Sequence, residues 1–125
     1  MNFPADLKYT TDHEWIRVEG DVGTIGVTDH AQGELGDVVY VDIPDSSATV
    51  AKGDTFGSIE AVKTVADLYA PVSGEIIEVN AVNAAPEAVN KEPYDGGWLV
   101  KIKLSDPSEL DALLTVDAYK ALIGA

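Results

Sequence analysis

The sequence contains no cysteine and only two histidines, His13 and His30. Without cysteine the chain has no disulfide framework, no cysteine nucleophile and no zinc–thiolate site. A Ser-His-Asp triad would need one of the two histidines, and the Gly-x-Ser-x-Gly segment that seats such a serine is absent. A two-histidine metal site lacks further ligands at a suitable spacing. These absences argue against thiol, hydrolase and metal chemistry.

Basic residues are also scarce. Eight Lys and Arg stand against 22 Asp and Glu, which gives a net charge of −14 and a pI near 4.1. A surface this acidic repels phosphate backbones and anionic membranes, so we expect no nucleic-acid partner and favour proteins with basic docking surfaces. No apolar run approaches the ~20 residues of a membrane span. The first residues lack the features of a signal or transit peptide, so we expect a cytoplasmic protein.

The residues that are present predict one mainly β domain over 1–125. Hydrophobic residues make up 46% and charged residues 24%, close to the average for globular proteins. Short runs of strand-forming residues, separated by turn residues, recur along the chain. We expect strands over 14–18, 22–27, 37–43 (ended by Pro44 and a loop over 45–47), 55–62, 65–69, 75–79 and 98–104.

Helix signals are few and short. Thr28 can cap a helix that Gly36 ends, and a helical turn can follow Pro86. Asp106-Pro107-Ser108-Glu109 places an N-cap, a proline at the first helical position and a glutamate at the third, as in a capping box, and so predicts the start of a C-terminal helical segment. Leu110, Leu113 and Leu114 form an apolar stripe for packing. A last helix is expected over 116–123. The two tryptophans, Trp15 and Trp98, are expected in the core or half-buried in strands.

Lys63 lies between two strand-like runs, where the sequence predicts a hairpin tip. A solvated lysine is cationic at neutral pH and is a poor nucleophile. Taken alone, such a lysine only solubilises a turn or blunts a strand edge.

The surrounding pattern is much more specific. The segment Glu60-Ala61-Val62-Lys63, followed by Ala70-Pro71-Val72-Ser73-Gly74-Glu75-Ile76, closely resembles the lipoyl-attachment region of the glycine cleavage system H protein family. The likeness extends in order from about Leu7 to the last helix. It includes His13-Glu14-Trp15, Ile25-Gly26-Val27-Thr28-Asp29-His30-Ala31-Gln32, Leu35-Gly36-Asp37, Tyr94-Asp95-Gly96-Gly97-Trp98 and Lys101-Ile102-Lys103.

The resemblance implies a lipoyl-domain-like barrel-sandwich hybrid of two antiparallel sheets. Lys63 matches the lysine that carries lipoic acid in amide linkage. Glu60 and Gly74 match positions that lipoylating enzymes recognise. Glu14 resembles a residue of the cleft that holds the loaded arm, and Asp67 is a second candidate for that cleft. One departure is the pair Gly33-Glu34, where some members bear a histidine, so an imidazole beside the arm is not expected here.

The implied function is that of a non-catalytic carrier, expected to be a monomer. In the family, a lipoyl-lysine arm takes the aminomethyl group of glycine from the pyridoxal-phosphate glycine decarboxylase (P protein). It delivers the group to the aminomethyltransferase (T protein), and dihydrolipoamide dehydrogenase (L protein) then reoxidises the arm. Cysteine is unnecessary in such a protein because the reactive sulfurs belong to lipoic acid.

Several alternatives stay open on sequence grounds. An H-like protein can instead relay lipoyl groups to other lipoyl domains. A biotinyl domain usually has Met-Lys-Met, and a 2-oxo acid dehydrogenase lipoyl domain has Asp-Lys-Ala within a longer chain; here the residues are Val62-Lys63-Thr64. More distant alternatives are an enzyme using His13 and Glu14 as an acid–base pair, and an interaction module with an unmodified Lys63.

Overall fold

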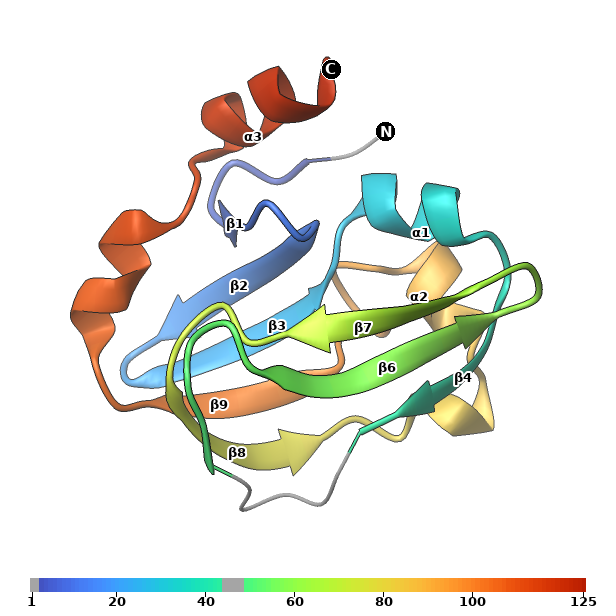
Figure 1. Cartoon of the computed structure of the whole chain (residues 1–125), viewed down its shortest axis with the longest axis horizontal. Helices are drawn as coiled ribbons and strands as arrows, with labels where there is room; N and C mark the ends of the chain where they lie inside the picture. Colours follow the sequence, from blue (N-terminus) through green and yellow to red (C-terminus); the bar gives the residue numbers. More distant parts are fainter. Residues whose placement is uncertain (1–2, 44–48) are drawn as a thin grey trace.

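The computed structural model describes residues 3–43 and 49–125, and across them the chain forms two antiparallel sheets that face each other (Figure 1). Every strand pair is antiparallel. This confirms the predicted mainly β sandwich with short helices. The expected stop at Pro44 and the loop over 45–47 lie outside the described residues.

The larger sheet has the order β1-β2-β3-β9-β8-β5, and the smaller has the order β4-β6-β7. The larger sheet consists of β1 (Lys8–Tyr9), β2 (Glu14–Glu19), β3 (Val22–Val27), β9 (Val100–Leu104), β8 (Gly74–Val79) and β5 (Thr49–Val50). The smaller sheet consists of β4 (Val38–Asp42), β6 (Thr55–Ala61) and β7 (Val65–Tyr69). Strand β9 begins two residues after the predicted start, because Trp98 and Leu99 lead out of a turn.

The main core lies between the two sheets. Alternate residues of each strand point inward, so aliphatic side chains of both layers meet there. Its fully buried members include Ile16, Ile25, Ile59, Val72, Ile76, Leu99 and Ile102.

A second, aromatic cluster holds the two chain ends against the larger sheet. Tyr119 of α3 (Val116–Ile123) stacks on Tyr9 with ring centroids 4.8 Å apart. Trp15 is fully buried, and its indole N–H lies 2.9 Å from the carbonyl of Pro93 and 3.1 Å from that of Val27. Trp98 is half-buried, so both tryptophans sit as predicted.

The short helices form at the predicted signals. The Thr28 hydroxyl accepts from the Ala31 N–H and starts α1 (Asp29–Leu35), which ends at Gly36 with φ 76°. A 3-10 turn, η1 (Val82–Ala84), and α2 (Ala88–Lys91) occupy the segment around Pro86. In the described part of the chain, no helix is long and apolar enough to cross a membrane.

The segment after Asp106 differs from a regular helix start. It forms a 3-10 helix, η2 (Pro107–Ala112), and Asp106 accepts from the Ser108 N–H. Glu109 does not reach back to cap this end. Its two carboxylate oxygens instead accept from the N–H and hydroxyl of Ser73, at 2.7 and 2.9 Å. A tertiary contact therefore replaces the local capping box that the sequence suggested.

Candidate functional site

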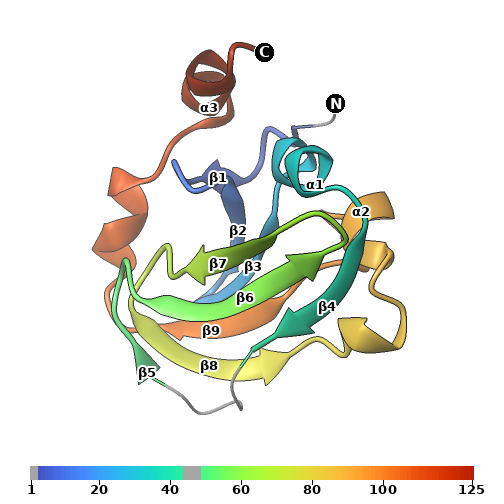
Figure 2. The same ribbon diagram turned by 45° about the vertical axis from the view of Figure 1, so that its right-hand side comes forward.

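Lys63 stands at the exposed tip of the β6–β7 hairpin, which projects beyond the neighbouring strands in Figure 1. In Figure 2 the loop of this hairpin lies beside the link from α1 to β4. The tip is pinned by two backbone hydrogen bonds, from the Ala61 N–H to the Thr64 carbonyl and from the Val62 N–H to the Asp37 carbonyl. The hairpin is therefore a firm support for an accessible lysine.

The aliphatic stem of Lys63 lies against Gly36, the residue that ends α1. A Cβ at position 36 would come within 2.5 Å of Lys63 Cε. Gly36 also has φ 76° and ψ −157°, a backbone region that is open in practice only to glycine. The glycine thus serves both the turn after α1 and the close approach of the lysine stem.

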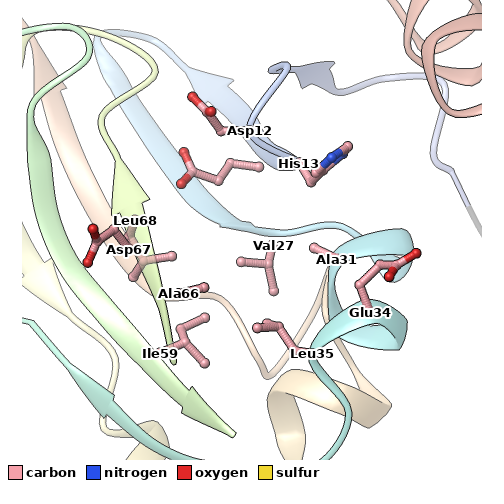
Figure 3. Close-up of a pocket in the computed structure, with 11 residues that line it drawn as sticks. Asp12, His13, Val27, Ala31, Glu34, Leu35, Ile59, Ala66, Asp67 and Leu68 are labelled. Atoms are coloured by element: carbon pink, nitrogen blue, oxygen red, sulfur yellow. The ribbon is translucent and has the colours of Figure 1, made fainter. Parts of the chain in front are cut away.

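A cavity of about 190 Å³ opens beside the hairpin, between β7, β3, α1 and the loop before β2 (Figure 3). Apolar side chains converge on its centre, and polar groups lie around them. The apolar lining comprises Val27, Ala31, Leu35, Ile59, Ala66 and Leu68; the polar lining comprises Asp12, His13, Glu14, Glu34 and Asp67.

Among the described residues, Glu14 is the only one with a charged side chain that is fully buried, with 1% of its surface exposed. One carboxylate oxygen, Oε2, accepts from the Tyr69 N–H at 2.8 Å, whereas Oε1 has no hydrogen-bond partner. Burial raises the pKa of Glu14 to about 8, although the Tyr69 hydrogen bond opposes the shift; the nearby negative charge of Asp12 adds to it. A buried oxygen without a partner is costly and suits a site that receives a donor or a cation.

Asp67 lines the same cavity but is placed differently. It alternates along β7 with Ala66 and Leu68, whose side chains face inward, and its own side chain is exposed. In Figure 3 its carboxylate points away from the cavity's apolar centre. The structure therefore brings Glu14 and Asp67 to one cavity, one inside it and the other on its outer edge.

Glu60 and Gly74 lie on different sheets. Glu60 is exposed near the end of β6, three residues before Lys63. Gly74 is buried at the start of β8, where it pairs with Val50 and Leu104. A Cβ on Gly74 would collide with the Lys103 carbonyl oxygen and reach 3.0 Å from Ile102 Cγ1. Packing against β9 alone is enough to require glycine here.

His13 lines the cavity and packs against His30, and its side chain is hydrogen-bonded to Tyr119, not to Glu14. His13, at φ 64°, has Nδ1 2.9 Å from the Tyr119 hydroxyl, and its ring lies 4.8 Å from that of His30. Burial lowers the pKa of His13, and His30 lowers it further. Within the described chain no hydrogen bond joins the His13 and Glu14 side chains, and no cluster of His, Asp and Glu could hold a metal ion.

Sequence reasoning treated Glu34 only as a departure from the family, yet the structure places it on the cavity. It lies on α1, with its carboxylate 3.8 Å from His30 Nε2. Asp12 was also missed. The helical spacing of Ala31, Glu34 and Leu35 puts all three on one face, and that signal was available in the sequence.

Comparisons with known proteins agree with one another over nearly the whole chain. A family model described as "Glycine cleavage H-protein" matches residues 7–125. The "Glycine cleavage system H protein" of Staphylococcus haemolyticus is 54% identical over 125 residues, covering 99% of both chains. That of Bacteroides thetaiotaomicron is 56% identical and covers 98% of both. A crystal structure of a glycine cleavage system H protein from Mycobacterium marinum superimposes with a TM-score of 0.90 at 39% identity, covering 98% of this chain and 100% of that one.

Proposed function

The chain belongs to the glycine cleavage H-protein family, a family of lipoyl carriers, and we propose that its lipoyl group is attached to Lys63. On this arm the chain would carry the aminomethyl group of glycine from the P protein to the T protein. The L protein would then reoxidise the arm. The chain itself would act in the cytoplasm as a non-catalytic carrier.

One observation carries the proposal. The hairpin that carries the exposed Lys63 at its tip also lines, through Ile59 of β6 and Leu68 of β7, an apolar cavity that holds a buried carboxyl with a free oxygen. An apolar arm with a cationic end needs such a combination of tether point, apolar lining and acceptor. The residues present therefore fit the group.

Each residue of the site has a distinct task in this proposal. Lys63 supplies the amide nitrogen and the flexible stem, and Gly36 leaves that stem room to lie flat. The apolar lining excludes water from the arm's end. Lipoic acid, when bound, supplies a disulfide that is opened and closed as the aminomethyl group is taken up and released.

Glu14 would hold the loaded amine. An ammonium group near its carboxyl favours the ionised form, so Glu14 would lose its proton as the amine docks. The free Oε1 would then gain a donor, and the buried charge a counterion. Asp67, on the outer edge of the cavity, would attract the amine before it enters.

The proposal is tested by intact-mass spectrometry of the chain expressed with lipoate and active lipoylating enzymes. We expect an added mass equal to one lipoyl group, located at Lys63 by peptide mapping. A chain that stays unmodified under these conditions, or that is modified at another lysine, contradicts the proposal.

Glu60 and Gly74 support lipoylation in different ways. Glu60 is free to meet the lipoylating enzyme, whereas Gly74 preserves the pairing of β8 with β9. We expect Gly74→Ala to destabilise the protein by about 1–3 kcal/mol in urea denaturation, because the new methyl collides with backbone. At a temperature where the variant is folded, we expect its lipoylation rate to be close to that of the wild type.

Gly33→Ala is the matched control. Nothing lies within 4 Å of a Cβ at position 33, which is inside α1, so this variant should be stabilised by about 0.5–1 kcal/mol. A folded Gly74→Ala protein that is lipoylated far more slowly than the wild type would show that Gly74 is read directly.

A further inference from the structure

The hydroxyl of Tyr119 joins two segments that build the cavity beside the hairpin. Tyr119 is fully buried on α3, and its hydroxyl oxygen lies 2.9 Å from His13 Nδ1 and 2.8 Å from the Thr28 hydroxyl oxygen. His13 ends the loop before β2 and directly precedes Glu14. Thr28 caps the first turn of α1 by accepting from the Ala31 N–H. One hydroxyl of the C-terminal helix therefore holds both a loop and a helix that line the cavity, without lining it itself (Figure 1).

His13 needs such a hold, because its backbone conformation is unfavourable. Its φ of 64° is the only positive φ of a non-glycine residue in the described chain. A side chain disfavours this left-handed region, so the conformation persists only where the surroundings fix it. The Tyr119 hydroxyl acts beside a backbone bond, in which the Thr28 N–H donates to the His13 carbonyl at 3.0 Å. The backbone bond ties the loop to the start of α1, and the hydroxyl bond fixes the imidazole ring above it.

The protonation states of the three side chains suit a permanent contact. A phenol has one proton, so Tyr119 donates to one partner and accepts from the other. The Thr28 oxygen accepts from the Ala31 N–H and still offers Tyr119 its own proton or a second lone pair. Burial raises the pKa of Tyr119 and lowers the pKa of His13, so a protonated phenol faces a neutral imidazole at neutral pH. The contact therefore needs no buried charge and persists across the neutral range.

Accepting the proposed function, in which Lys63 carries the lipoyl arm, we infer that Tyr119 is a positioning residue for the loaded arm. Its hydroxyl holds the loop before β2 and the start of α1 at the spacing that closes the cavity around Glu14. Because His13 and Glu14 are adjacent, a rotation of the His13 backbone re-aims the Glu14 carboxyl. Because α1 begins after Thr28, a shift of Thr28 moves the face of α1 that lines the cavity. Without the hydroxyl, we expect water to reach the carboxyl and the end of the arm.

The experiment compares Tyr119→Phe with Tyr9→Phe. The ring of Tyr119 stacks on Tyr9 at 4.8 Å and meets Phe3 edge-on at 5.8 Å, and phenylalanine keeps both contacts while it loses the hydroxyl. Tyr9 is also fully buried in the aromatic cluster, and its hydroxyl donates to the Pro4 carbonyl at 2.6 Å. Pro4 is not among the residues that line the cavity. The two variants therefore lose the same group from the same cluster, and they differ in whether that group holds the cavity.

The first measurement follows the titration of Glu14 in the unmodified chain by NMR. The Tyr69 N–H donates to the Glu14 carboxylate, so the chemical shift of this amide reports the protonation of Glu14. Burial raises the pKa of Glu14 to about 8 in the wild type. We expect Tyr119→Phe to lower the midpoint by about one pH unit or more, because water at the carboxyl stabilises its charged form, and Tyr9→Phe to leave it unchanged. All three proteins keep the other titratable groups that line the cavity, which are Asp12, His13, Glu34 and Asp67.

The second measurement follows the loaded arm. Each lipoylated protein is loaded with glycine by purified P protein, separated from it and assayed for released formaldehyde. In this hydrolysis water attacks the carbon between sulfur and nitrogen, and the carbon–sulfur and carbon–nitrogen bonds break to give a thiol, formaldehyde and ammonium. We expect the release to be about fivefold faster or more for Tyr119→Phe, because a loosened cavity admits water, and within about twofold of the wild type for Tyr9→Phe.

Urea unfolding curves define conditions in which both variants are folded. The inference requires both readouts to change for Tyr119→Phe and neither to change for Tyr9→Phe, and any other pattern overturns it. Equal effects of the two variants would mean that the aromatic cluster only stabilises the fold. Failure of the proposed function looks different, because the wild type then gains no lipoyl group and cannot be loaded. The titration of Glu14 uses the unmodified chain, so it tests the role of the Tyr119 hydroxyl in that case too.

Discussion

Lys63→Arg is expected to abolish carrier activity while leaving the fold intact. Arginine keeps the positive charge and the long stem, but its guanidinium stays protonated in proteins and does not become an acyl acceptor. We expect no mass gain and, in a system reconstituted with the P, T and L proteins, glycine turnover no higher than without the carrier. Because Lys63 is exposed, the free energy of unfolding should change by less than about 0.5 kcal/mol.

Lys52→Arg is the matched control for this result. Lys52 is also an exposed lysine in a turn, but it lies outside the β6–β7 hairpin. This variant should gain one lipoyl group and support turnover like the wild type. Turnover by Lys63→Arg, or a full lipoyl mass on it, would show that the arm is attached elsewhere.

Local signals in the sequence account for most of the fold. The Thr28 cap, the Gly36 stop and the last helix at 116–123 appear where the sequence predicts them, because each depends on side chains within a few residues. The start of η2 differs because Glu109 binds Ser73, 36 residues away in the sequence. A contact of that range leaves no local pattern to read.

The site residues likewise divide into those that local sequence patterns predict and those whose placement depends on contacts between distant parts of the chain. The position of Lys63 follows from the hairpin pattern and the family resemblance. The burial of Glu14 could not be foreseen, since it depends on β7, β3 and α1 closing around the first residue of β2. Asp67 was grouped with Glu14 because of its nearness to the lysine, but strand alternation turns its side chain to the outer face. Gly74 looked like a recognition residue, and the structure adds a packing reason for it.

Glu14→Gln is expected to remove a pH dependence from the stability of the unmodified protein. The unfolded chain titrates this carboxyl near the ordinary value of 4.5, whereas burial raises the pKa of folded Glu14 to about 8. Between these values the folded chain holds a proton that the unfolded chain has lost. The free energy of unfolding therefore falls as the pH rises from about 4.5 to 8, by at most about 1.4 kcal/mol per pH unit and by a total on the order of 5 kcal/mol.

The measurement is the difference in unfolding free energy between Glu14→Gln and the wild type, from urea curves at pH 5 to 9. Glutamine keeps the acceptor for the Tyr69 N–H, and other groups titrate alike in both proteins, so the difference isolates Glu14. We expect the variant to become more stable relative to the wild type as the pH rises, and this difference in unfolding free energy to level off above about pH 8.

Asp12→Asn should shift this pH profile to lower pH, because the negative charge of Asp12 is a second cause of the raised pKa of Glu14. A difference that is constant from pH 5 to 9 would mean that Glu14 is already ionised in the folded chain. The cavity would then present a full negative charge to an entering amine, and docking of the amine would release no proton.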